Sequence, residues 1–198
     1  MREYTITKIE GAPNWDLIPS LPIDNLLWTE PVDITAEAKI GYDENALHVC
    51  LRAKEAHIRA EHTGLVGMPC EDSCLEFFFS PDPEDLRYIN IEFNPNAAMY
   101  LGTGTGIQNL LRIVPEEPCF QPEVTRFDGG WQIVYQVPYS FIRQIFPGFS
   151  PVSGGKIRAN CYKCGDLTPH PHFLAWNPVT SETPAFHRPQ DFGVMYFG

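Results

Sequence analysis

The stretch Arg87–Asn94, RYINIEFN, decides the fold class because its apolar and polar residues alternate without interruption. Side chains alternate across a β-strand, so Ile89, Ile91 and Phe93 share one face and are expected in a core. The other face carries groups with directional hydrogen bonds, namely Tyr88, Asn90, Glu92 and Asn94. The stretch therefore predicts a β-strand with one buried face and one polar face.

Strand-like runs with turn signals between them continue along the chain in both directions. Residues 123–138, EVTRFDGGWQIVYQVP, predict a hairpin closed by an Asp-Gly-Gly turn. Residues 138–146 predict a short helix, and the stretches 11–31 and 164–190 are expected to be long loops. The other expected strands are 36–42, 46–53, 74–80, 155–165 and 192–197.

Many short strands, with neither a repeat nor a break in composition, predict one all-β domain over residues 1–198. We expect an antiparallel β-sandwich of jelly-roll type, with long loops and at most short helices.

Composition argues against several classes of partner. The formal net charge of −11 argues against nucleic acid and against anionic membranes. No apolar run reaches the roughly 18 residues that a membrane-spanning helix needs. The opening residues MREYTITKIE lack the apolar segment of a signal peptide. The expected location is cytoplasmic, or secreted or periplasmic if a signal sequence precedes this chain in the natural protein.

The six cysteines are expected to be free thiols. Cys161 and Cys164, followed by His170 and His172, have the spacing of some zinc sites. On one strand, however, a separation of three residues points the two thiols to opposite faces. We therefore expect neither a disulfide nor zinc here, while a zinc-binding interaction module stays open as an alternative.

The polar strand faces suggest recognition of a sugar. Glu76 shares a face with Cys74 and Phe78, and the 155–165 strand places Asn160 and Lys163 on opposite faces. Sugars offer hydroxyl groups at their edges and flat C–H faces that stack on aromatic rings, so amides, carboxylates and a tryptophan suit them. Trp176 is the expected stacking platform, and the hydrogen-bonding candidates are Glu76, Asn90, Glu92, Asn94, Asn160, Lys163, Asn177 and Arg188.

An enzyme is the second reading of the same residues. Glycoside hydrolysis uses two carboxyl groups about 5 to 9.5 Å apart. Glu76 and Glu92 could stand that close across neighbouring strands. A glycoside hydrolase that acts on O-glycosyl bonds with this pair therefore stays open beside the preferred reading, which has no catalytic residue.

Four segments together resemble the family 9-like carbohydrate-binding domains. They are CEDSCLEFFFSP (70–81), YINIEFNPNAAMYLG (88–102), ANCYKCGD (159–166) and HFLAWNPVTSETPAFHRPQDFG (172–193). Their order and spacing are similar to that family from about residue 35 to the end of the chain.

The resemblance implies an antiparallel β-sandwich of bacterial origin that binds glycans without cleaving them. Related modules accompany xylan- or cellulose-degrading enzymes, clamp a sugar-chain end between two tryptophans and hold structural calcium in some members. Trp176 resembles the second of these tryptophans, while Cys70 stands near the place of the first, so half of the clamp is missing. The resemblance thus implies a carbohydrate ligand and a role in carbohydrate catabolism. No cofactor is expected, apart from the structural calcium that the resemblance allows.

Overall fold

The alternating stretch forms a central strand, as its pattern predicts. In the computed structural model, which describes residues 1–198, β7 (Tyr88–Phe93) lies between β6 (Cys74–Ser80) and β8 (Met99–Gly104). Both neighbours are antiparallel to β7. Ile89, Ile91 and Phe93 are buried in the main core, as expected.

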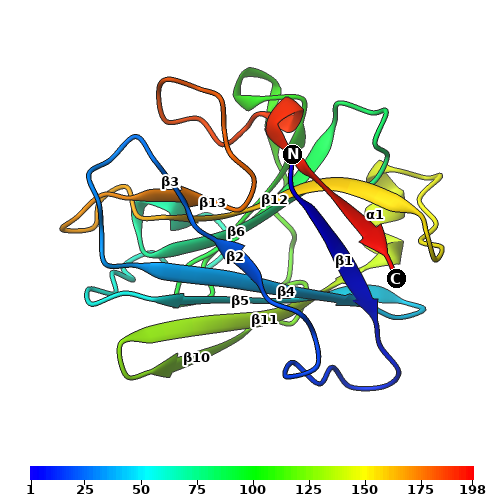
Figure 1. Cartoon of the computed structure of the whole chain (residues 1–198), viewed down its shortest axis with the longest axis horizontal. Coiled ribbons are helices and arrows are strands. Elements are labelled where there is room, and N and C mark those ends of the chain that lie inside the picture. The colour runs from blue at the N-terminus through cyan, green and yellow to red at the C-terminus, as the bar shows by residue number, and fades with distance from the viewer.

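The strands form one curled sheet whose two halves face each other (Figure 1). The first half contains β10 (Glu123–Phe127), β11 (Gly130–Pro138), β5 (Ala46–Lys54), β4 (Thr35–Tyr42) and β2 (Leu21–Ile23). The second half contains β14 (Gly193–Phe197), β12 (Lys156–Cys164), β6, β7, β8, β9 (Leu111–Arg112), β13 (Phe173–Ala175) and β3 (Asn25–Leu27). The fold is therefore all-β, as predicted.

The strand β1 (Glu3–Lys8) joins the two halves. Its first part pairs in parallel with β14, and its last two residues pair in parallel with β4. Figure 1 shows β1, in dark blue, beside the red C-terminal strand. Every other strand pair is antiparallel, so the expectation of a wholly antiparallel arrangement is corrected at β1.

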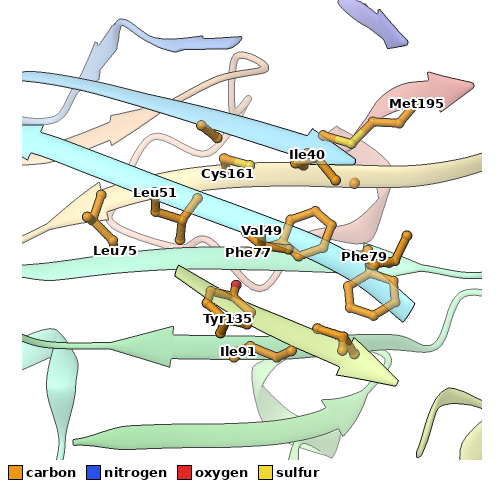
Figure 2. Packing of buried hydrophobic residues seen from close by; sticks show 14 of the residues in the cluster. Ile40, Val49, Leu51, Leu75, Phe77, Phe79, Ile91, Tyr135, Cys161 and Met195 are labelled. Carbon is orange, nitrogen blue, oxygen red and sulfur yellow. The ribbon is translucent and has the colours of Figure 1, made fainter. Parts of the chain in front are cut away.

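The main core fills the space between the two halves. A cluster of 36 buried residues draws side chains from both of them. Figure 2 shows Val49 and Tyr135 from the first half packed with Phe77, Phe79 and other side chains from the second. Burial of this apolar surface is the main source of stability for such a fold.

The predicted hairpin and helix form where the sequence placed them. Phe127 pairs with Gly130, which leaves the two-residue turn Asp128–Gly129, and Gly129 takes the left-handed φ of 73° that such turns need. The one α-helix, α1, covers Tyr139–Ile145. Three short 3₁₀ turns span Pro69–Glu71, Ile107–Asn109 and Pro189–Asp191. None of the helices is long and apolar enough to cross a membrane.

The two stretches expected to be plain loops contain strands. β2 and β3 lie within residues 11–31, and β13 lies within residues 164–190. Each has only three residues, too few for an alternating pattern to mark it, and β3 pairs only with β13, far along the chain.

The polar face of the second half is partly covered. Phe78, Tyr88 and Tyr162 on that face pack with Phe186 and Phe192 from the C-terminal segment in a second buried cluster. The rings of Tyr162 and Phe186 stack with centroids 4.1 Å apart. A cavity lined in part by this C-terminal segment forms the candidate site.

Candidate functional site

Two glutamates from neighbouring strands meet on the polar face. Glu76 of β6 stands directly opposite Glu92 of β7, which in turn stands opposite Tyr100 of β8. The two glutamates are only 2% and 5% exposed. The Asn90 amide donates to Glu92 Oε1 at 2.9 Å, and the Cys164 thiol donates to Glu76 Oε1 at 2.9 Å. Glu76 and Glu92, the carboxyl pair that the sequence suggested, therefore lie directly opposite each other on neighbouring strands.

Burial keeps these carboxyl groups neutral. Removal from water raises the pKa of Glu76 to about 8. It also raises the pKa of Glu92 well above its ordinary value, with repulsion from Glu76 as the next cause. Neither carboxylate takes part in an ion pair. At neutral pH the pair therefore carries protons and can donate hydrogen bonds as well as accept them.

A cavity of about 600 Å³ opens above the pair. Glu76, Glu92 and Cys164 line it together with aromatic side chains, with Met68 and Cys70, and with the loop 105–110. The aromatic residues in its lining are Trp28, Tyr100, Phe173, Phe186 and His187. Its size lies within the range of about 300–1,000 Å³ that is usual for small-molecule sites.

Trp28 provides the indole of this cavity. Its Nε1 donates to the Ser181 carbonyl at 2.7 Å, and its ring lies 5.7 Å from Phe173 and 5.6 Å from Phe186 between centroids. The residue is half-buried, so part of the ring stays accessible. The sequence favoured Trp176 as the aromatic platform and did not single out Trp28. Its backbone φ of 58° belongs to an irregular loop, and no periodic signal could reveal where its ring points.

Tyr100 is the second aromatic residue that sequence reasoning missed. The Arg112 guanidinium lies 4.4 Å from the centroid of its ring. Arg112 also donates to the carbonyls of Leu65 and Gly67 at 3.2 and 2.6 Å, which fixes the loop beside the cavity. Because Tyr100 stands opposite Glu92 on β8, strand pairing was the signal that could have found it.

His187 and Arg188 line the cavity on the C-terminal segment. His187 Nδ1 and the Tyr88 hydroxyl share a hydrogen bond of 2.8 Å, and burial lowers the pKa of His187 to about 4. The imidazole is therefore neutral at physiological pH. Arg188 donates to Asp191 Oδ2 at 2.7 Å and to Thr180 Oγ1 at 3.1 Å.

Trp176 does not have the exposed ring that a stacking platform needs. It is 2% exposed and belongs to the main core. A Cβ placed on Gly193 would lie 2.6 Å from its ring, so the indole is packed tightly against that backbone. The expectation of a solvent-facing Trp176 is wrong. The segment before it was expected to be a loop, but it forms β13, which pairs with β12, and Trp176 lies in the main core.

The asparagine candidates stabilise the fold around the site. Asn160 donates to the Asn177 carbonyl at 3.0 Å and accepts from the Asn177 amide at 2.8 Å. Asn177 accepts from the Arg2 amide at 2.7 Å, and Asn94 donates to Asp72 at 2.7 Å. These side chains are buried and absent from the cavity lining, and Asn90 reaches the site only through Glu92.

Lys163 faces the opposite side of the sheet from Glu76. Its Nζ lies 3.2 Å from Glu55 Oε2 and donates to His172 Nε2 at 2.7 Å, fully buried in the core. It cannot contact a ligand in the cavity. Of the nine predicted site residues, Glu76, Glu92 and Arg188 therefore line the cavity.

The cysteines contradict the zinc constellation suggested by spacing. Cys161 lies in the main core and Cys164 in the second cluster, on the other face of β12. All six cysteines are free thiols in this structure. Cys161 and Cys164 thus cannot ligate one ion together, as strand alternation indicates.

A comparison of the sequence with family models settles the family. The sequence model of carbohydrate-binding family 9 matches residues 14–197, nearly the whole chain. The chain belongs to carbohydrate-binding family 9. No match was found among curated proteins.

Solved structures of similar fold agree with family 9. A presumed carbohydrate-binding protein from Bacteroides uniformis is 26% identical, with a TM-score of 0.84 over 100% of this chain and 99% of that one. A family 9 module from Caldicellulosiruptor kristjanssonii was solved with cellotriose and with glucose. Each of these two structures is 10% identical, and their TM-scores are 0.73 and 0.70. They cover 99% and 100% of this chain, and the match spans 93% and 96% of theirs.

Proposed function

We propose that this family 9 domain binds carbohydrate, without cleaving it, in the cavity above Glu76 and Glu92. The observation that carries the proposal is that one cavity combines an accessible indole, Trp28, with carboxyl groups on its floor. An apolar ring face beside convergent polar groups is what a sugar ring requires.

The polar groups around the cavity match the edge of a sugar. A protonated carboxyl group both donates and accepts, as a sugar hydroxyl does, so Glu76 and Glu92 suit hydroxyl groups without the cost of a buried charge. Arg188 adds a donor at the rim. Tyr100 lines the same cavity and supplies a second aromatic surface there.

We infer a ligand that contains glucose units, because modules of the same fold were solved with cellotriose and with glucose. We infer that Trp28 and Tyr100, which line the cavity together with Cys70, supply part of the aromatic surface that the family resemblance places near Cys70. We expect weak affinity, micromolar to millimolar, which corresponds to about −4 to −8 kcal/mol. The role we propose is glycan capture in polysaccharide or oligosaccharide catabolism, on a fold whose facing halves form a β-sandwich.

The protonation of Glu76 and Glu92 favours binding over hydrolysis. A glycosidase needs one ionised carboxylate as nucleophile or base beside one carboxylic acid. Here burial raises the pKa of both groups, which disfavours the ionised partner that this mechanism needs.

The test is calorimetric titration of the protein with glucose and cello-oligosaccharides. Trp28→Ala should weaken binding about tenfold or more, equivalent to about 1.4 kcal/mol. Trp15→Ala serves as the matched control, because Trp15 is also half-buried but lies outside this cavity. Equal affinity in both variants, or no binding by the unmodified protein, would overturn the proposal. Release of reducing sugar would favour the hydrolase instead.

A further inference from the structure

Two thiols and a carboxyl group converge at the floor of the cavity. Cys74 of β6 stands directly opposite Cys164 of β12, and Glu76 follows two residues after Cys74 on the same face. The two sulfur atoms and one carboxylate oxygen lie within 4.8 Å of one another. All three residues are buried, and no spacing rule in the sequence brings them together.

This cluster has no cationic partner in the protein. None of the eight ion pairs involves Glu76 or Glu92, and the nearby Lys163 points to the other face of the sheet. Burial also raises the pKa of Cys74 to about 12. Ionising such groups without a cation is costly, so they stay protonated until a cation replaces the protons.

We propose that Cys74, Glu76 and Cys164 bind a thiophilic divalent cation of the zinc type. Two sulfur ligands and one carboxylate suit Zn²⁺, whereas Ca²⁺ and Mg²⁺ prefer oxygen ligands. Zinc bonds of about 2.3 Å to sulfur and about 2.0–2.2 Å to oxygen are compatible with ligand atoms this close together. This site is distinct from the one that the Cys161 and Cys164 spacing suggested.

The cavity provides the entry path and the fourth coordination position. Glu76 and Cys164 both line the cavity, whereas Cys74 is buried close to both and is not part of the lining. Three protein ligands with one position left for water or another small ligand is the arrangement of open zinc sites. Binding releases the two thiol protons and the carboxyl proton to solvent, so affinity rises with pH.

The test uses reduced protein, treated with a chelator and then titrated with Zn²⁺ alone by calorimetry. Co²⁺ gives a second readout, since thiolate ligands produce a charge-transfer absorption. We expect one Zn²⁺ per chain, with binding weakened about tenfold or more in Cys164→Ser and in Glu76→Gln because each removes a ligand. Cys119→Ser is the control, because Cys119 is half-buried and outside the cavity.

Several outcomes would overturn the proposal. It fails if the protein binds no Zn²⁺, if the Co²⁺ spectrum lacks thiolate bands, or if Cys164→Ser binds Zn²⁺ as tightly as Cys119→Ser does. Glu76→Gln retains the thiols and the side-chain shape, so it keeps the test valid if the cysteine variants unfold. Titrating the chelator-treated protein with sugar measures sugar binding in the absence of metal, and the Zn²⁺ titration measures metal binding in the absence of sugar. The two proposals can therefore fail independently.

Discussion

At the scale of single residues, strand parity decides which polar side chains reach the cavity. Cys164 and Glu76 share the face that the cavity exposes, while Lys163, one residue earlier, points into the core. Side chains of neighbouring residues on a β-strand point to opposite faces of the sheet. By chemical type alone, Lys163 is as good a candidate for hydrogen bonding to a ligand as the residues that line the cavity. The alternation of the strand, however, already placed Lys163 on the opposite face from Asn160.

Trp176→Ala should destabilise the protein strongly. The indole is buried in the main core and packed against Gly193, so its loss leaves a cavity. Such changes cost about 3–5 kcal/mol, which equilibrium unfolding in denaturant would measure. The half-buried Trp15 gives the control variant Trp15→Ala. A loss within about 0.5 kcal/mol for Trp176→Ala, as on a surface, would contradict the buried position.

The Glu76 carboxyl group should make the protein less stable as pH rises. In the unfolded chain it ionises near its ordinary value of 4.5, whereas in the fold it holds its proton to about pH 8. The folded state therefore binds more protons between these values, and the free energy of unfolding falls as pH rises through that window. Glu76→Gln should flatten this dependence in denaturant titrations from pH 4.5 to pH 8.

The control for this pH prediction is an exposed glutamate, Glu123, changed to Gln. All proteins would be measured with a chelator present, so that no metal masks the proton linkage. Identical pH profiles for the original protein and Glu76→Gln would show that Glu76 ionises normally in the fold.

The pairing of Glu76 with Glu92 could be predicted from sequence, whereas the aromatic wall could not. Both glutamates lie on regular strands whose alternation fixes their face. Trp28 and Phe173 come from segments far apart in sequence and are brought together where β3 pairs with β13. No local pattern in the sequence predicts such a pairing, and the sequence instead favoured Trp176 as the aromatic platform.

At the scale of elements, β1 joins the two halves of the sheet. It pairs with β14 through Glu3–Ile6 and with β4 through Thr7 and Lys8. Tyr4 and Ile6 point into the core from this seam, and the Tyr4 hydroxyl donates to the Pro19 carbonyl at 2.8 Å.

Ile6→Ala should therefore destabilise the whole fold. A buried isoleucine changed to alanine costs about 2–5 kcal/mol, and here the lost contacts lie at the join. Thr5→Ala is the matched control, since Thr5 lies on the same strand with its side chain exposed. Thermal unfolding would compare them, and equal melting temperatures would mean that β1 adds little to the core.

The long strands and the hairpin were predictable because their patterns are local. The run 74–80 coincides with β6, and the Asp-Gly turn lies where the sequence placed it. β1 escaped prediction since its six residues pair only with strands distant in sequence. Parallel pairing of this kind leaves no turn signal beside it.

At the scale of the whole molecule, a buried polar cluster ties the two halves together through the core. Glu55, just after β5, accepts from the Trp131 indole at 2.8 Å and from the Ser73 hydroxyl at 2.9 Å. Lys163 of β12 completes the cluster from the opposite half, and it also donates to His172. The pKa of His172 falls to about 4, through burial first and then the Lys163 charge, so the imidazole stays neutral as an acceptor.

The ion pair between Glu55 and Lys163 should show strong coupling in a double-mutant cycle. Lys163→Met leaves the Glu55 carboxylate buried without its cation, and breaking a buried pair in this way costs about 3–5 kcal/mol. Glu55→Gln removes the charge but keeps acceptor and donor groups for Trp131 and Ser73. The double variant should therefore lose less stability than the sum of the two single variants, because no lone charge remains in the core. Equilibrium unfolding of the four proteins measures this difference, and strict additivity would mean that the two groups do not act as a pair across the halves.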